Sequence, residues 1–126
     1  MLRGAKKTSR ITASITREQE NCAIEYIKGA VHDHCNNLPH EDFSVRIMFG
    51  SNNNDWNGTA IQVIYDELLK RGRMCGRYST KDEIVKYAKN RASIDVGKLL
   101  KEVLINDRRN FYVSGKDTGK KYKLMP

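Results

Sequence analysis

Hydrophobic side chains follow their clearest pattern near the C-terminal end of the chain. Between residues 94 and 106 they recur at spacings of three and four, which places them on one face of an α-helix. This apolar stripe consists of Val96, Leu99, Leu100, Val103 and Leu104. The pattern predicts an amphipathic helix. Its other, exposed face would carry Asp95, Lys98, Lys101 and Glu102.

A shorter helix is predicted directly before it, over residues 81–90. Thr80 and Glu83 have the spacing of a capping box at its start. Arg91 and Ala92 then leave only a short joint before Ser93, which is a favourable N-cap. Two helices joined by three or four residues are typical of a helix-turn-helix.

After residue 107 the helical period gives way to alternation, which indicates β-strands. Residues 114–119 contain the turn formers of a hairpin, with Lys116 in the loop. One face of the predicted hairpin is apolar and comprises Phe111, Val113, Tyr122 and Leu124. The opposite face comprises Tyr112, Lys121 and Lys123.

The N-terminal half is predicted to begin with a helix. Thr16 and Gln19 have capping-box spacing, and the helix should run for about four turns until Asn36, Asn37 and Pro39 end it. Alternation over residues 43–49 predicts a half-buried strand.

A polar loop is expected over residues 50–58, with Trp56 packed against the core. The next helix should run from Thr59 to Arg71, with Gly72 just after its end. A short strand is predicted over residues 74–78.

In this order of helix, strand, helix, helix and hairpin, residues 57–125 resemble the winged-helix superfamily. The resemblance rests on the order and spacing of the elements. It implies an α+β fold, a winged helix-turn-helix with the hairpin as its wing and with residues 15–50 as an N-terminal extension of helix and strand. We therefore expect a single domain over residues 15–126.

Residues 1–14 are basic and have no apolar period, so we expect a disordered arm. The arm has no apolar segment typical of a secretory signal, although its basic, acid-free composition also has some character of a mitochondrial transit peptide. Basic arms of some DNA-binding proteins contact a neighbouring groove; the alternative is a plain solvated terminus.

The chain has 126 residues, enough for one modest hydrophobic core. No stretch approaches the roughly 20 apolar residues of a membrane-spanning helix, so no membrane partner is expected. Cys22, Cys35 and Cys75 lack Cys-x-x-Cys spacing. Free thiols of this kind favour a reducing compartment, and we expect a cytoplasmic protein.

The net charge of +8 is unevenly distributed along the chain. Residues 1–16 carry +4, residues 17–71 carry −4 and residues 72–126 carry +8. The positive charge thus coincides with the predicted helix-turn-helix and wing. A basic surface attracts phosphates over long distances, which favours a nucleic-acid partner. The alternative interpretation is that these lysines only keep the protein soluble.

One cluster contains residue types that bind metals. His32, His34 and His40 lie within nine residues of each other, and His32 shares a helix face with Cys35 at i, i+3. No second pair with the ligand spacing of a zinc site accompanies them. We therefore expect no metal, no cofactor and no catalytic residue. The protein is not expected to be an enzyme.

Together these patterns predict a small nucleic-acid-binding protein, a regulator or accessory factor that binds duplex DNA mainly through phosphates. The helix over residues 94–106 would enter the major groove while the wing follows the backbone. That helix exposes no Arg, Asn or Gln in its first turns, so little base readout is expected. The expected contact residues are Lys98, Lys101, Arg108, Arg109, Lys116, Lys120, Lys121 and Lys123.

Two other classes of function fit the same sequence. A winged helix can also serve protein contacts or bind RNA, and a protein-contact role predicts an exposed apolar patch with weak salt dependence. A small metal-dependent enzyme predicts a metal bound within residues 32–42. A homodimer, if one forms, is expected to use residues 15–50.

Overall fold

The computed structural model describes residues 2, 10–50, 56–115 and 120–126. In this part of the chain, four helices precede a two-stranded antiparallel sheet, so the fold is α+β, as the sequence predicts. The elements are α1 (Arg17–Asn37), α2 (Val45–Phe49), α4 (Gln62–Met74), α5 (Lys81–Asn106), β1 (Phe111–Ser114) and β2 (Lys121–Leu124).

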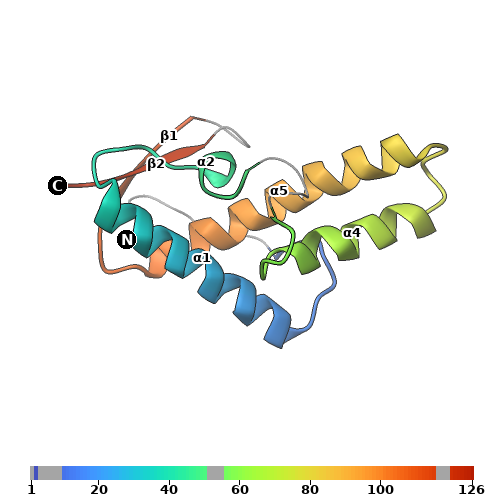
Figure 1. Ribbon diagram of the computed structural model, residues 1–126, viewed down its shortest axis with the longest axis horizontal. Helices are drawn as coiled ribbons and strands as arrows, with labels where there is room; N and C mark the ends of the chain where they lie inside the picture. Colours follow the sequence, from blue (N-terminus) through green and yellow to red (C-terminus); the bar gives the residue numbers. More distant parts are fainter. Residues whose placement is uncertain (1, 3–9, 51–55, 116–119) are drawn as a thin grey trace.

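The longest helix, α5, runs along most of the molecule (Figure 1). α4 packs beside its N-terminal half, and α1 packs against its C-terminal half. The β-hairpin lies at the end of the molecule where α5 finishes, opposite the turn that joins α4 to α5. The molecule therefore has two separate ends, one formed by the hairpin and one by the α4–α5 turn.

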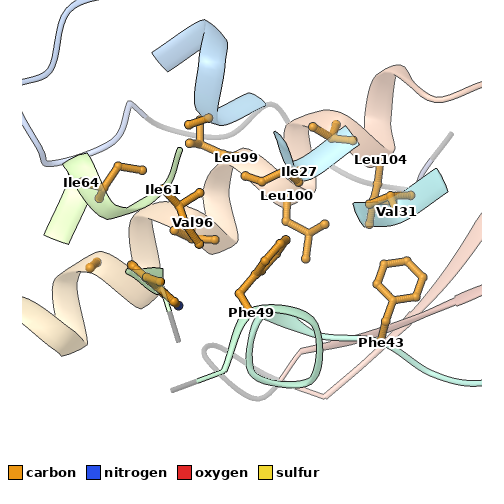
Figure 2. Close-up of a cluster of buried hydrophobic side chains, with 14 of the residues drawn as sticks. Ile27, Val31, Phe43, Phe49, Ile61, Ile64, Val96, Leu99, Leu100 and Leu104 are labelled. Atoms are coloured by element: carbon orange, nitrogen blue, oxygen red, sulfur yellow. The ribbon is translucent and has the colours of Figure 1, made fainter. Parts of the chain in front are cut away.

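Side chains from all these helices and both strands form one hydrophobic core. The apolar stripe predicted over residues 96–104 is buried, and Leu100 has no exposed surface. Figure 2 shows Ile27 of α1 beside Leu100 of α5 in this core. Trp56 is 3% exposed, which confirms that it packs against the core.

Two predictions about local structure are confirmed. The Thr16 hydroxyl accepts a hydrogen bond from Gln19 N (3.1 Å), and Gln19 Oε1 accepts one from Thr16 N (2.9 Å), so the capping box starts α1. β1 and β2 pair antiparallel as the predicted hairpin, with residues 116–119 outside the described part. Both motifs depend on residues that are close in sequence.

The break predicted between two helices at Arg91–Ser93 is wrong, because one continuous helix covers Lys81–Asn106. Thr80 caps this helix, as expected. No glycine or proline interrupts the predicted joint, and Ala92 within it is fully buried. With good helix formers and a core contact in place, the helix continues past Ser93.

The strand predicted over residues 43–49 is also wrong. Phe43 makes a single β-bridge to β2, and the following residues form α2. Ser44 starts this helix by accepting a hydrogen bond from Ile47 N (3.2 Å), and Gly50 follows its end with φ at 77°. A strand would have buried Ile47 with the other apolar residues, whereas 56% of its surface is exposed.

α4 covers a later stretch of chain than predicted. A helix was expected over residues 59–71, and it is found over Gln62–Met74. The strand predicted for residues 74–78 is wrong, because this segment contains the last residue of α4 and part of the turn to α5. Gly76 in that turn has φ at 72°, a left-handed conformation that glycine adopts without strain.

The sequence predicted that Gly72 follows the end of this helix, but Gly72 lies inside α4. It is buried against α5, where a Cβ would lie 3.1 Å from both Ile84 Cγ2 and Tyr87 Cδ1. The absence of a side chain therefore lets the two helices approach closely.

Residues 10–14 do not form part of a disordered arm, in contrast to the prediction for residues 1–14. They lie against α4 and α5 and are called the N-terminal strap below. Ala13 of the strap is buried. Leu2 is also buried and forms a β-bridge with Phe111, while residues 1 and 3–9 lie outside the described part.

Candidate nucleic-acid interface

Part of the inner face of the hairpin is buried, and each strand has a β-bridge at its edge, but Val113, which was predicted on the apolar face, is 43% exposed. Phe111 and Tyr122 are 0% and 4% exposed, and Phe43 contacts both rings at centroid distances of 5.9 Å. Phe43 also pairs with the edge of β2 through two backbone hydrogen bonds to Tyr122 (2.8 and 2.7 Å). Leu2 occupies the edge of β1 at Phe111. The outer face is exposed along both strands.

That outer face consists of Tyr112, Ser114, Lys121 and Lys123, all of which are exposed. Tyr112 is paired with Lys123, and Ser114 with Lys121. Residues paired in this way lie about 4.5 to 5.5 Å apart at their Cα atoms. Neither strand contains an acidic residue, so the face carries positive charge only. The alternation in the sequence predicts this lysine face correctly.

Tyr112 is a residue of this face that the expected contact set omitted. The sequence did contain the signal, because Tyr112 alternates with Phe111 and Val113 and so falls on the side opposite the core. The structure confirms the placement, with 54% of the Tyr112 surface exposed.

The other predicted contact residues are distributed differently. Lys98 is half-buried, and its Nζ donates a hydrogen bond to the Arg10 carbonyl (3.1 Å) in the N-terminal strap. Lys101 is half-buried on α5, and Arg108 is exposed just beyond that helix. Lys116 lies outside the described residues. Among these residues, Lys98 therefore binds the backbone of the N-terminal strap.

Lys120 and Arg109 flank the two strands of the hairpin. Lys120 is half-buried directly before β2. Arg109 donates to Asp107 Oδ1 from its backbone N (2.8 Å) and Nε (3.0 Å), and to Oδ2 from Nη2 (2.8 Å). These side-chain hydrogen bonds lower the pKa of Asp107 and raise that of Arg109. Burial raises the pKa of the nearby Cys35 thiol, and the Arg109 charge partly offsets this rise. Arg109 thus stabilises the end of α5.

Asp95 was expected to face the nucleic acid, but it is fully buried. Its two carboxylate oxygens accept hydrogen bonds from Thr12 N (2.8 Å) and Ala13 N (2.9 Å). Arg91 Nη2 donates to Thr12 Oγ1 (2.8 Å), and Arg71 Nη1 donates to the Thr12 carbonyl (2.8 Å). The N-terminal strap therefore covers part of the α5 surface that was expected to enter a groove.

A second group of exposed cationic side chains lies at the opposite end of the molecule, around the α4–α5 turn (Figure 1). Its members are Arg73, Arg77, Lys81 and Lys86. Asp82 and Glu83 lie among them in the first turn of α5. This end is mixed in charge, unlike the strands of the hairpin.

The histidine cluster is divided among separate contacts. His32 Nε2 lies 3.0 Å from Asn36 Nδ2, and His34 Nε2 lies 2.9 Å from the Glu41 carbonyl oxygen. The His34 ring also packs against Phe43 at 4.9 Å. Within the described ranges, no group of three His, Cys, Asp or Glu residues is placed to hold a metal ion.

Comparison with known proteins gives no match to this chain among family models, curated proteins or solved structures. Across the described helices, none is both long enough and apolar enough to cross a membrane. Function must then be inferred from the chemistry of the hairpin surface itself.

Proposed function

We propose that the protein binds nucleic acid through the outer face of its hairpin. The main support is the pair Lys121 and Lys123, which lie two residues apart on one exposed strand face, with no acidic residue in either strand. Positions i and i+2 of a strand are roughly 7 Å apart, so the two charges repel each other. A polyanion is attracted to these two positive charges and reduces the repulsion between them.

Duplex DNA is the form that the sequence predicts, with the protein acting as a regulator or accessory factor. The helix-turn-helix part of the predicted winged helix is absent from the described structure, so in this proposal the hairpin alone follows the phosphate backbone. α5 contributes less than a recognition helix would, because Asp95 and Lys98 hold the N-terminal strap. Affinity then depends on phosphates, with little preference among base sequences.

The test is a fluorescence-anisotropy titration with a labelled duplex of mixed sequence at two salt concentrations. Each phosphate contact adds about 0.9 to the slope of log affinity against log salt. If Lys120, Lys121 and Lys123 each make one contact, replacing all three with Ala should reduce the slope by about 2.7. For the parent protein, these three contacts alone predict a loss of at least roughly 40-fold in affinity between about 50 and 200 mM salt.

A matched variant separates local contacts from overall charge. Replacing Lys81, Lys86 and Lys89 with Ala removes the same charge from α5, far from the hairpin (Figure 1). We expect a smaller change in slope for this variant than for the hairpin variant. Equal changes in both variants, or an affinity that is flat across the salt range, would contradict binding by the hairpin.

Protein contact is a second candidate function, supported by an apolar surface within residues 15–50. Ile47 of α2 is 56% exposed and Tyr26 of α1 is 37% exposed, and the Tyr26 ring lies 5.7 Å from that of Phe49. A homodimer would bury this surface. Light scattering over a range of concentrations should then detect a dimer that Ile47→Asp dissociates, and a monomer throughout would exclude it.

A further inference from the structure

We infer that the outer face of the hairpin binds single-stranded nucleic acid, with an unpaired base stacked on Tyr112 and neighbouring phosphates held by Lys121 and Lys123. This inference rests on the proposed nucleic-acid function: the same lysines would contact the phosphates of a duplex or of a single strand, and Tyr112 adds a base contact that favours the single strand.

The position of Tyr112 is the first reason. It lies on the same face as both lysines, directly paired with Lys123 and diagonally placed from Lys121. Its surface is 54% exposed. Long side chains at diagonal strand positions remain within reach of each other. One aromatic ring therefore lies beside two cationic side chains of the neighbouring strand on a single open surface.

The second reason is the contrast with other aromatic residues. Tyr78 and Tyr87 face each other at a centroid distance of 5.2 Å, and Tyr26 faces Phe49 at 5.7 Å. Within the described part of the chain, Tyr112 makes no ring contact of this kind. Its ring is thus free to accept a stacking partner.

The chemistry of the partner follows from these two features. In a duplex the base faces are covered by neighbouring bases, so a protein ring cannot stack on them without deforming the helix. Unpaired bases expose those faces, and single-strand-binding proteins combine aromatic stacking with cationic contacts to the backbone. An exposed tyrosine beside two lysines therefore fits a single strand better than a duplex.

The edges of the hairpin argue against a peptide as the occupant. Docking by strand addition requires a free edge with unpaired backbone groups. Phe43 already pairs with β2 at Tyr122, and Leu2 forms a bridge with β1 at Phe111. The open surface is the side-chain face, which offers a ring and two positive charges.

The experiment compares four labelled probes in anisotropy titrations of the full chain: oligothymidine and oligouridine of about ten nucleotides, an abasic strand of equal length and a mixed-sequence duplex. The abasic strand keeps the phosphates but offers no base to stack. We expect oligothymidine to bind about five- to hundredfold more tightly than the abasic strand. The oligouridine probe distinguishes RNA from DNA as the source of the same chemistry.

Variants of Tyr112 separate stacking from charge. Tyr112→Ala should lose that five- to hundredfold advantage with an unchanged salt slope, because tyrosine neutralises no phosphate. Tyr112→Phe should retain it, and Tyr112→Leu, which fills similar space without an aromatic ring, should not. Thermal melting shows whether each variant is folded.

Equal binding of the abasic strand and oligothymidine would overturn this inference, as would a Tyr112→Leu variant with parental affinity. In either case the proposed nucleic-acid function would stand if the duplex still bound with the expected salt slope. If none of the probes bound even at low salt, the proposed function itself would be wrong.

Discussion

Asp95 shows how one buried carboxylate holds a distant segment. It has no exposed surface, and its oxygens accept hydrogen bonds from the backbone N–H groups of Thr12 and Ala13 at 2.8 and 2.9 Å. Burial of a carboxylate is tolerated only when hydrogen bonds replace its hydration. Asp95 is therefore a structural residue, and its negative charge is not presented to a nucleic acid.

We predict that Asp95→Ala lowers the free energy of unfolding by about 3 kcal/mol, because it removes two charge-assisted hydrogen bonds and leaves two N–H groups without partners. Urea unfolding followed by circular dichroism measures the loss. Glu102→Ala changes an exposed acidic residue of the same helix and should cost less than about 0.5 kcal/mol. Similar costs for the two variants would show that Asp95 does not anchor the N-terminal strap.

The Asp107–Arg109 pair predicts a dependence of stability on acid pH. Hydrogen bonds from the Arg109 side chain lower the pKa of Asp107 in the folded protein. A group with a lowered folded pKa contributes stability above its unfolded pKa of about 3.9 and loses it as pH falls through the folded value. Asp107→Asn should therefore be less stable than the parent at neutral pH.

This difference should shrink as pH falls below about 4, where the parent carboxylate also becomes protonated. Urea midpoints measured across that range test the prediction. The control variant Asp33→Asn changes an exposed carboxylate of α1 and should cost less than about 0.5 kcal/mol at neutral pH. If the gap between Asp107→Asn and the parent were independent of pH, ionisation of Asp107 would not be its cause.

At the scale of elements, the packing of α4 against α5 depends on Gly72. A Cβ at this position would meet Ile84 and Tyr87 at 3.1 Å, whereas a Cβ at Gly29 in α1 would have no neighbour within 4 Å. Alanine is a better helix former than glycine by about 1 kcal/mol in a helix interior. The two glycines therefore separate helix propensity from helix packing.

We predict that Gly29→Ala raises the free energy of unfolding by up to about 1 kcal/mol. Gly72→Val should lower it by roughly 1 to 3 kcal/mol, because the added methyl groups force the two helices apart. Thermal and urea unfolding of both variants give the comparison. Stabilisation by Gly72→Val would mean that α4 and α5 do not approach as closely as described.

At the scale of the whole molecule, the N-terminal strap joins α4 to α5. Arg71 of α4 donates to the Thr12 carbonyl and to Ser14 Oγ, both at 2.8 Å, while Arg91 of α5 donates to Thr12 Oγ1. Two cationic side chains, one of them from the basic segment 72–126, are thereby used within the fold. The net charge of the chain consequently overstates the charge that is free to meet a partner.

This linkage predicts a coupling that can be measured. In a chain lacking residues 1–14, the backbone N–H groups that donate hydrogen bonds to Asp95 are absent. Asp95→Ala should therefore lower the free energy of unfolding much less in this shortened chain than in the full chain. A double-mutant cycle by urea unfolding gives the coupling energy. Equal costs of Asp95→Ala with and without residues 1–14 would rule out the linkage.

Much of the local structure could be predicted from the sequence alone. Thr16 and Gln19 cap α1, the stripe from Val96 to Leu104 is buried, and alternation places Tyr112 with the lysines on the outer face of the hairpin. In each case the deciding residues lie within a few positions of one another, so the spacing itself carries the physical information.

Tertiary structure decided the features whose partners are remote or whose local signals compete. Ser93 is a good N-cap, yet burial of Ala92 against the core keeps α5 continuous through it. Ser44 caps a helix where alternation had favoured a strand. Asp95 looked exposed because its partners, Thr12 and Ala13, are 83 and 82 residues away in the chain. Spacing determines which face a side chain occupies, but only the packed chain determines what covers that face.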